Sequence, residues 1–180
     1  MSNGTLCSGN STSVSLTGST GAIQWQSSAD NITFANIGGA TSTTYNTPAL
    51  TSTIYYRAVV TSGVCASATS TVDTVIVSPL SVGGNITPGS SALCSGSSTV
   101  LSLTGYTGTL QWQSSADNLT FTNISGATSA SYNTPALTST IYYRVVAISG
   151  VCSLANSTKD TITVSPLSVA GSSTVSNGML

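Results

Sequence analysis

Residues 6–18 read LCSGNSTSVSLTG, and residues 93–105 read LCSGSSTVLSLTG, so the same stretch recurs after a step of 87 residues. The same step relates Trp25 to Trp112, and no gap is needed anywhere in the comparison. About three quarters of the paired positions are identical. Self-similarity at a fixed period of domain size indicates tandem copies of one compact domain. The chain is therefore predicted to hold two repeats of the same fold.

The period also predicts the domain boundaries. The first repeat is expected over residues 1–82 and the second over residues 83–169, and residues 170–180 form a tail that begins a third copy. Residues 176–178 repeat the Ser-Asn-Gly of residues 2–4 in phase. We interpret the chain as a two-repeat excerpt of a longer array, with a finished two-domain protein and a short tail as the alternative.

Each repeat carries the pattern of short antiparallel strands. Apolar residues alternate with hydroxyl residues, and Gly, Asn, Pro and Ser separate the alternating runs. In the first repeat the runs with this period of two are residues 14–16, 23–25, 32–34, 43–45, 54–60 and 71–77. Six or seven short strands at this spacing predict an all-β fold, an antiparallel β-sandwich in each repeat.

A comparison of the two repeats assigns one core face. Ala58 and Val60 of the first repeat become Val145 and Ala147 in the second, so a small and a large residue exchange places two positions apart. Because the summed volume is preserved, these side chains are predicted to point into one close-packed core.

The composition excludes several classes of function. Only 4% of the residues are charged, histidine is absent and the formal net charge is −1. The charged side chains are Arg57, Arg144, Lys159, Asp30, Asp73, Asp117 and Asp160. No nucleophile has a base partner, and no dense basic surface exists for nucleic acid. No apolar run approaches the roughly 20 residues that span a bilayer. We therefore expect no enzyme, no nucleic acid partner and no membrane insertion.

Four quoted motifs carry a family resemblance. They are LCSG at residues 6–9, QWQSSADN at 24–31, YNTPALTSTIYYR at 45–57 and SGVC at 62–65. This pattern, nearly end to end in both repeats, resembles the tandem immunoglobulin-like repeats of Bacteroidetes secreted and cell-surface proteins. Such repeats occur in large exported adhesins, including gliding-motility adhesins, which typically use the type IX secretion system. The resemblance implies two tandem immunoglobulin-like antiparallel β-sandwich domains and an extracellular location.

The cysteines suggest a disulfide framework. Cys7 and Cys65 lie 58 residues apart, as do Cys94 and Cys152, so each repeat holds one pair. Because the first strand of such a sandwich runs beside the last, we predict Cys7–Cys65 and Cys94–Cys152 bonds. Bonds between adjacent repeats and free thiols are the alternatives, whereas one pair without histidine offers too few ligands for zinc. Disulfides in turn predict an oxidising compartment.

The aromatic residues divide into core and contact candidates. We predict as core the four residues Trp25, Trp112, Tyr56 and Tyr143, which match the buried strand tryptophan and a following tyrosine of an immunoglobulin-like sandwich. A sugar-stacking platform is the alternative for the tryptophans. The candidate contact residues are Tyr106, which replaces Ser19 of the first repeat, and Tyr55 and Tyr142, which point away from the core tyrosines.

The aspartates are predicted to serve turns. Asp30 and Asp117 lie in Ala-Asp-Asn segments, where an aspartate bonds nearby backbone amides. Calcium is the alternative, but it needs six to eight oxygen ligands, and two aspartates per repeat make a weak set. We assign no metal, no cofactor and no catalytic residue.

Three functional hypotheses remain. The first is a structural spacer repeat of a large cell-surface adhesin that presents distal binding domains. The second is a carbohydrate- or protein-binding module attached to a secreted enzyme. The third is a self-assembling extracellular filament subunit, in which the tail from Ala170 to Val175 adds a strand to the next chain. The expected partners are neighbouring repeats of the array, with a surface polysaccharide or protein as a further candidate.

Overall fold

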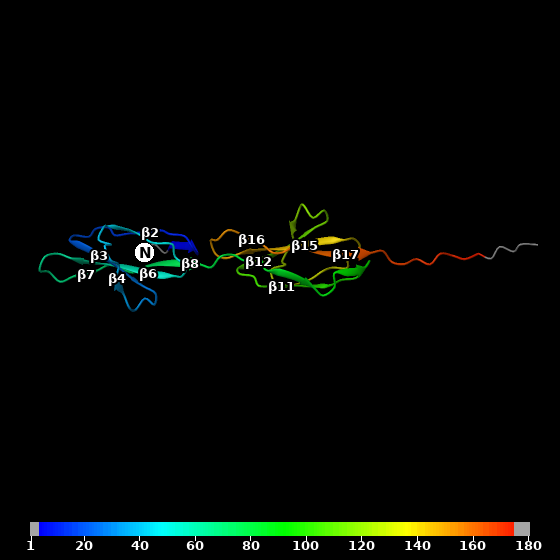
Figure 1. The fold of residues 1–180 in the computed structure, drawn as a ribbon, viewed down its shortest axis with the longest axis horizontal. Helices are drawn as coiled ribbons and strands as arrows, with labels where there is room; N and C mark the ends of the chain where they lie inside the picture. The colour runs from blue at the N-terminus through cyan, green and yellow to red at the C-terminus, as the bar shows by residue number, and fades with distance from the viewer. Residues whose placement is uncertain (1–3, 175–180) are drawn as a thin grey trace, which may run out of the picture. The chain divides into compact units, whose positions relative to one another are not determined.

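The computed structural model describes residues 4–174, and residues 175–180 of the predicted tail lie outside this range. No helix occurs between Gly4 and Thr174, and the chain is a succession of short strands joined by turns (Figure 1). The strands of the first repeat are β1 (Gly4–Cys7), β2 (Ser13–Ser15), β3 (Ala22–Ser28), β4 (Ala35–Asn36), β5 (Thr44–Asn46), β6 (Ile54–Thr61), β7 (Ala68–Thr69) and β8 (Asp73–Ser78). The all-β prediction is confirmed.

The second repeat has the same strands and one more. They are β9 (Asn85–Pro88), β10 (Ala92–Cys94), β11 (Val100–Thr104), β12 (Thr109–Ser115), β13 (Thr122–Asn123), β14 (Ser131–Asn133), β15 (Ile141–Ile148), β16 (Ala155–Asn156) and β17 (Asp160–Ser165). The additional strand is β9, which has no counterpart among the described residues of the first repeat.

Each repeat is a sandwich of two sheets. In the first, one sheet has the order β1-β8-β6-β3-β4, with β7 paired to β6, and the other consists of β2 and β5. The second repeat has β10-β17-β15-β12-β13, with β16 paired to β15, against β14-β11-β9. The first strand pairs with the last in parallel, as β1 with β8, whereas β6 pairs antiparallel with β8. Strand direction therefore decides at which end of the sheet each loop lies.

The core lies between the two sheets of each repeat. In the first repeat Trp25, Tyr56, Ala58 and Val75 are buried together with Val14 of the opposite sheet. Of the residues exchanged between the repeats, Ala58, Val145 and Ala147 are fully buried, and Val60 is half-buried and packs against the core of the first repeat, so they share the predicted face. The alternating pattern therefore places the sandwich core correctly.

The run at residues 32–34 does not form a strand. Ile32 is 82% exposed, and the next strand, β4, begins only at Ala35. The side chain of Asp30 accepts hydrogen bonds from the backbone N–H groups of Ile32 and Thr33, at 2.8 Å each. These bonds fold the chain into a turn, so an alternating pattern is overridden by local side-chain chemistry.

The described chain forms two compact units whose boundary departs from the repeat boundary. The first unit takes in the chain up to Gly83 together with residues 105–109 and 146–156. The second unit consists of Gly84–Thr104, Leu110–Val145 and the chain from Ser157 onward. Two segments of the second repeat thus belong to the first unit.

Candidate functional site: a disulfide junction in the first unit

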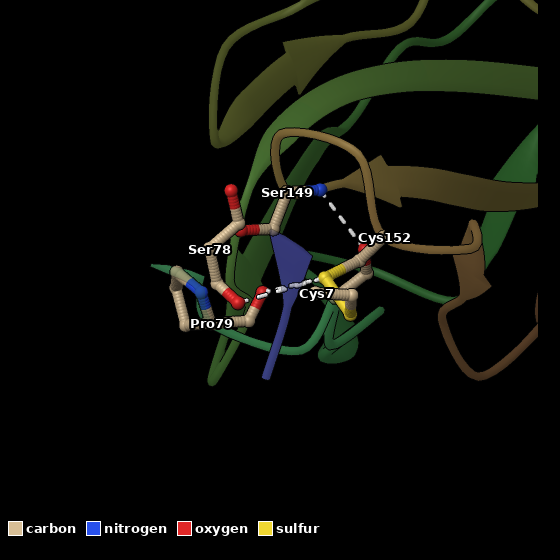
Figure 2. The surroundings of a disulfide bond; sticks show 6 residues. Cys7, Ser78, Pro79, Ser149 and Cys152 are labelled. Atoms are coloured by element: carbon tan, nitrogen blue, oxygen red, sulfur yellow. Dashed lines mark hydrogen bonds between the residues drawn. A yellow bond between two sulfur atoms is a disulfide. The ribbon is translucent and has the colours of Figure 1, made fainter. Parts of the chain in front are cut away.

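A disulfide joins Cys7 to Cys152 within the first unit (Figure 2). Cys7 is the last residue of β1, and Cys152 lies in the loop after β15, so the bond connects residues 145 positions apart. Their Cα atoms are 4.9 Å apart, within the usual range for a bridged pair. The bond therefore links a residue of the first repeat covalently to a residue of the second.

The predicted pairing within each repeat is wrong. Cys65 and Cys94 are exposed and unbonded among the described residues. Cys7 pairs in register with Ser78, at the end of β8, and therefore lies beside the beginning of β6, whereas Cys65 follows the end of β6. Eight strand residues at about 3.4 Å each separate those two ends by roughly 27 Å, but a disulfide needs Cα atoms closer than about 7 Å.

The loop that carries Cys152 is seated on the end of β8. The backbone N–H of Cys152 donates to the carbonyl of Ser149 at 2.9 Å, which closes the loop into a tight turn. Figure 2 shows the Cys152 sulfur facing the carbonyl oxygens of Ser78 and Pro79, at 3.6 and 3.2 Å. Because a bonded sulfur carries no proton, these are close contacts in the oxidised state, and only the reduced thiol can donate to these carbonyls.

Hydrogen bonds also join the residues after β8 to the two other segments of the first unit. The Ser149 N–H donates to the Ser81 hydroxyl at 2.9 Å. Val82 and Thr107 exchange two backbone hydrogen bonds, at 3.2 and 2.9 Å. Ser149 and Cys152 are 7% and 6% exposed. We use the name junction for the Cys7–Cys152 bond together with Ser78–Val82, Thr107 and Ser149–Gly150.

Gly150 offers a direct test of the junction. A Cβ built on Gly150 would overlap the Ser78 side chain, whereas a Cβ on its counterpart Gly63 meets no described atom within 4 Å. Both glycines have nearly equal positive φ angles, 52° and 54°, so the backbone strain of an alanine is matched. Gly150→Ala is therefore expected to slow formation of the Cys7–Cys152 bond during oxidative refolding more than Gly63→Ala does. Equal rates, followed by mass spectrometry of alkylated samples, would exclude the Ser78 contact as a determinant.

The predicted core aromatics are buried. Trp25 and Trp112 are 1% and 0% exposed, and their indole N–H groups donate to the carbonyls of Ser42 and Ser129 at 2.8 Å. Burial raises the pKa of both Tyr56 and Tyr143 to about 12. No indole face is left for a sugar, so the stacking alternative lacks a surface at these tryptophans.

The contact candidates lie apart from this core. Tyr106 is 39% exposed and belongs to the segment of residues 105–109 that falls in the first unit, next to Thr107 of the junction. Tyr55 and Tyr142 are half-buried on β6 and β15. The structure does not bring these three tyrosines together into one binding surface within either unit.

The turn aspartates bond backbone amides as expected from turn chemistry. Asp117 accepts hydrogen bonds from the Ser115 hydroxyl at 2.7 Å and from the N–H groups of Leu119 and Thr120. The following residues, Asn31 and Asn118, have positive φ angles of 60° and 59°. Hydrogen bonds from Thr33 and Ile32 lower the pKa of Asp30 from 3.8 to about 2, and those from Ser115, Leu119 and Thr120 lower the pKa of Asp117 to about 2.

These shifts predict acid sensitivity in a narrow window. A carboxylate whose folded pKa is depressed stabilises the fold above its unfolded pKa, and this contribution is lost as the pH falls from about 4 toward 2. The wild-type melting temperature should therefore drop over this interval. Asp30→Asn combined with Asp117→Asn should flatten the drop while leaving the curve between pH 5 and 7 flat. Identical slopes in thermal melts of both proteins would show that the two turns do not contribute.

Within the described range, no three Cys, Asp, Glu or His side chains gather as a metal site. A search of residues 4–174 likewise finds no helix long and apolar enough to cross a membrane.

The loop residues of the junction were not among the residues predicted from the sequence. Ser78–Val82 and Ser149–Gly150 lie in connections between strands and carry no charge. A signal was nevertheless available, because the stretches 62–65 and 78–82 recur without any change as 149–152 and 165–169. The amino-acid sequence of connections usually varies more than that of strands, so two unchanged connections indicate that their residues make structural contacts.

The topology and the core define a pair of immunoglobulin-like sandwich domains, and solved structures share this fold. One similar chain comes from the crystal structure of the mouse coronavirus receptor-binding domain complexed with its murine receptor, with a TM-score of 0.60 and 12% identity, covering 89% of this chain and 95% of that one. Murine CEACAM1b gives a TM-score of 0.55 and 16% identity, covering 91% and 96%. The amphioxus IgVJ-C2 molecule gives 0.51 and 11%, covering 88% and 99%. At these identities the likeness establishes the fold.

The chain belongs to the family described as Domain of unknown function (DUF8696), whose model matches residues 1–79 and again residues 82–166. Two matches in series establish tandem repeats of one domain. No curated protein matches the sequence.

Proposed function

We propose that the chain is a structural repeat of a large extracellular surface protein, of the adhesin type that its motifs resemble in Bacteroidetes, and that its task is to keep its length under tension. The Cys7–Cys152 bond is the observation that carries this proposal, because it closes a loop over a separation of 145 residues. A pulling force applied outside these two residues passes through the disulfide and not through the folded chain between them. Residues 8–151 are therefore shielded from the load and do not extend.

The surface chemistry supports the same proposal. Hydroxyl and amide side chains keep the surface polar with very few charges, and only three lysine or arginine residues offer sites to trypsin-like proteases. Disulfides persist in oxidising compartments and are rare in the cytosol, which favours an extracellular location. The proposal assigns no catalytic residue.

Single-molecule force extension tests the proposal. The oxidised chain, held at both termini, should extend about 500 Å less than the Cys7→Ser/Cys152→Ser variant, since an extended residue spans at most about 3.5 Å. The Cys65→Ser/Cys94→Ser variant should keep the short extension of the wild type. An oxidised wild-type chain that unfolds to its full contour length would remove the load-bearing function.

A second candidate function, self-assembly by strand addition, is favoured by an open groove in the first unit. In the second unit β9 pairs with β11, through Ile86 opposite Leu103, and Leu103 is 4% exposed. The equivalent Leu16 in the first unit is only half-buried, and a cavity of about 440 Å³ lies beside it, lined also by Trp25 and Thr71. This groove lies where a strand equivalent to β9 would pack.

The tail offers a strand for that groove in a second copy. Ala170–Thr174 matches Gly83–Thr87, and Thr158 shows how a threonine anchors such a strand, by donating its N–H to the Gly84 carbonyl and accepting from the Ile86 N–H, each at 3.2 Å. Thr71 is the counterpart of Thr158. Since Ser173 replaces Ile86, backbone hydrogen bonds supply most of the binding and little apolar surface is buried.

Sedimentation velocity tests strand addition without interference from disulfides. In the Cys65→Ser/Cys94→Ser background, the average mass should rise with concentration, and deletion of residues 170–180 should abolish the rise. A mass that stays monomeric at every concentration would eliminate this candidate.

A further inference from the structure

We infer that Cys94 and Cys65 are the two halves of a second junction, formed between two copies of this chain, in which Cys94 of one copy bonds to Cys65 of the next. The step of 87 residues maps Cys7 onto Cys94 and Cys65 onto Cys152. The bonded pair Cys7–Cys152 therefore consists of the first cysteine of one repeat and the second cysteine of the following repeat. Within residues 4–174 that rule leaves Cys94 and Cys65 unbonded, and both are exposed.

The residues around Cys94 have the same backbone arrangement as those around Cys7. Cys94 pairs in register with Ser165 as Cys7 pairs with Ser78. The backbone N–H of the residue after each cysteine donates to the carbonyl of that serine, at 2.8 Å in both repeats. The residues that follow, 165–169, read SPLSV, as do residues 78–82. The surface that receives Cys152 in the first junction is therefore reproduced next to Cys94.

The loop around Cys65 likewise has the same backbone arrangement as the loop around Cys152. The Cys65 N–H donates to the Ser62 carbonyl at 3.0 Å, as Cys152 donates to Ser149 at 2.9 Å. Gly63 and Gly150 have matching φ angles of 54° and 52°. The loop that inserts into the first junction therefore exists in the same conformation around Cys65, before any partner is bound.

Exposure separates the formed junction from the unformed one. Cys152 and Ser149 are buried, but their counterparts Cys65 and Ser62 are exposed. Val64 is 106% exposed, compared with 58% for Val151. On the other half, Ser81 is half-buried but Ser168 is exposed. Two preformed and complementary surfaces without a partner fit a second copy of the same chain.

The first junction specifies the contacts of the second. The Ser168 hydroxyl of one copy accepts from the Ser62 N–H of the next, as Ser81 accepts from Ser149. Val169 and Thr20 exchange the backbone bonds that Val82 and Thr107 make. Gly63 then lies against Ser165, where a side chain would collide, as Gly150 lies against Ser78. Geometry therefore selects Cys65 over other thiols as the partner of Cys94.

Formation of the bond is a two-electron oxidation. The two S–H bonds of Cys94 and Cys65 break and one S–S bond forms, which releases two protons and two electrons. A small-molecule disulfide such as oxidised glutathione accepts them, and its own S–S bond is cleaved to give two thiols. This chemistry needs only an oxidising compartment and a disulfide oxidant.

Both the Cys94–Cys65 bond and strand addition join two copies of the chain, but the bond uses the two cysteines and strand addition uses the tail and the groove of the first unit. The inference also differs from the load-bearing proposal, which depends on Cys7 and Cys152 alone. Each of the three can therefore fail without the others, and a chain that lacks residues 170–180 keeps every residue of the second junction.

Mixing two single-cysteine variants tests the inference. Cys65→Ser retains Cys94, and Cys94→Ser retains Cys65, so under oxidised glutathione their mixture should give a covalent heterodimer on non-reducing gels. Each variant alone should cross-link at least tenfold more slowly, and wild-type chain should give a ladder of higher oligomers. The heterodimer should also form when residues 170–180 are deleted from both partners.

Two further variants show whether the junction surface guides the reaction. Gly63→Asn adds a side chain at the Ser165 contact while asparagine tolerates the positive φ, and Ser168→Ala removes the hydroxyl acceptor. Each should slow the heterodimer severalfold without changing the rate at which the remaining thiol reacts with a small aromatic disulfide reagent, which also reports that the variant is folded. Homodimers that form as fast as the heterodimer would overturn the inference, as would an internal Cys65–Cys94 bond or wild-type chains that stay monomeric with reactive thiols.

Discussion

Removal of the Cys7–Cys152 bond is expected to lower the free energy of unfolding by about 5 kcal/mol, the entropy that a cross-link across roughly 145 residues withdraws from the unfolded chain. The bond joins two strand-rich regions far apart in sequence, so the unfolded ensemble gains more freedom than it would from a shorter loop. The variant Cys7→Ser/Cys152→Ser should therefore lose most of the stability of the first unit.

Denaturant unfolding followed by tryptophan fluorescence measures this loss, because Trp25 and Trp112 are both buried. The matched control is Cys65→Ser/Cys94→Ser, which should change the free energy of unfolding by less than about 0.5 kcal/mol, as expected for exposed sites. Equal losses in the two double variants would mean that the bonded pair has no special role.

Truncation of Trp112 is the second large effect that we expect. Trp112→Ala should cost about 3–5 kcal/mol, because the side chain is fully buried and its N–H bonds the Ser129 carbonyl. Trp25→Ala should cost less than Trp112→Ala, since Trp25 already borders the open groove of the first unit. Tyr106→Ala, at a 39% exposed position, should be nearly neutral.

Thermal melts of the three variants rank these costs. Circular dichroism is the suitable signal, because each tryptophan variant has lost one of the two tryptophans whose fluorescence would report unfolding. A cost for Trp25→Ala equal to or above that for Trp112→Ala would show that the groove does not loosen the core of the first unit.

The fold can be predicted from the sequence because core packing imposes a regular spacing on the apolar residues. The repeat of 87 residues sets the number of domains, and the exchange of Ala58 and Val60 for Val145 and Ala147 identifies a buried face without coordinates. The failure at residues 32–34 has a local cause. A single carboxylate at Asp30 bonds two backbone amides and forms a turn that alternation alone does not reveal.

The cysteine pairing could not be obtained from spacing alone. Equal separations of 58 residues suggested one bond in each repeat, yet a strand carries the chain to the opposite end of the sheet. Since β1 runs parallel to β8 and β6 runs antiparallel to it, Cys7 and Cys65 must lie at opposite ends of their sandwich. Strand direction, applied to the expected topology, would have excluded the pairing within a repeat.

The remaining residues of the junction depend on contacts between loops, and no period marks such contacts. Ser81 and Ser149 are 68 positions apart and resemble the many other serines of this chain. Only the unchanged stretches 62–65 and 78–82, compared with their second copies, point to them.

A tryptic digest without reduction decides whether Cys7 is bonded to Cys152, because cleavage after Arg57, Arg144 and Lys159 places Cys7, Cys152 and the other two cysteines in three different peptides. In the monomeric chain, after free thiols are blocked, peptide 1–57 should remain joined to peptide 145–159, and peptide 58–144 should be released with two blocked thiols. A single species that holds all three peptides together, as bonds within each repeat require, would contradict the Cys7–Cys152 bond.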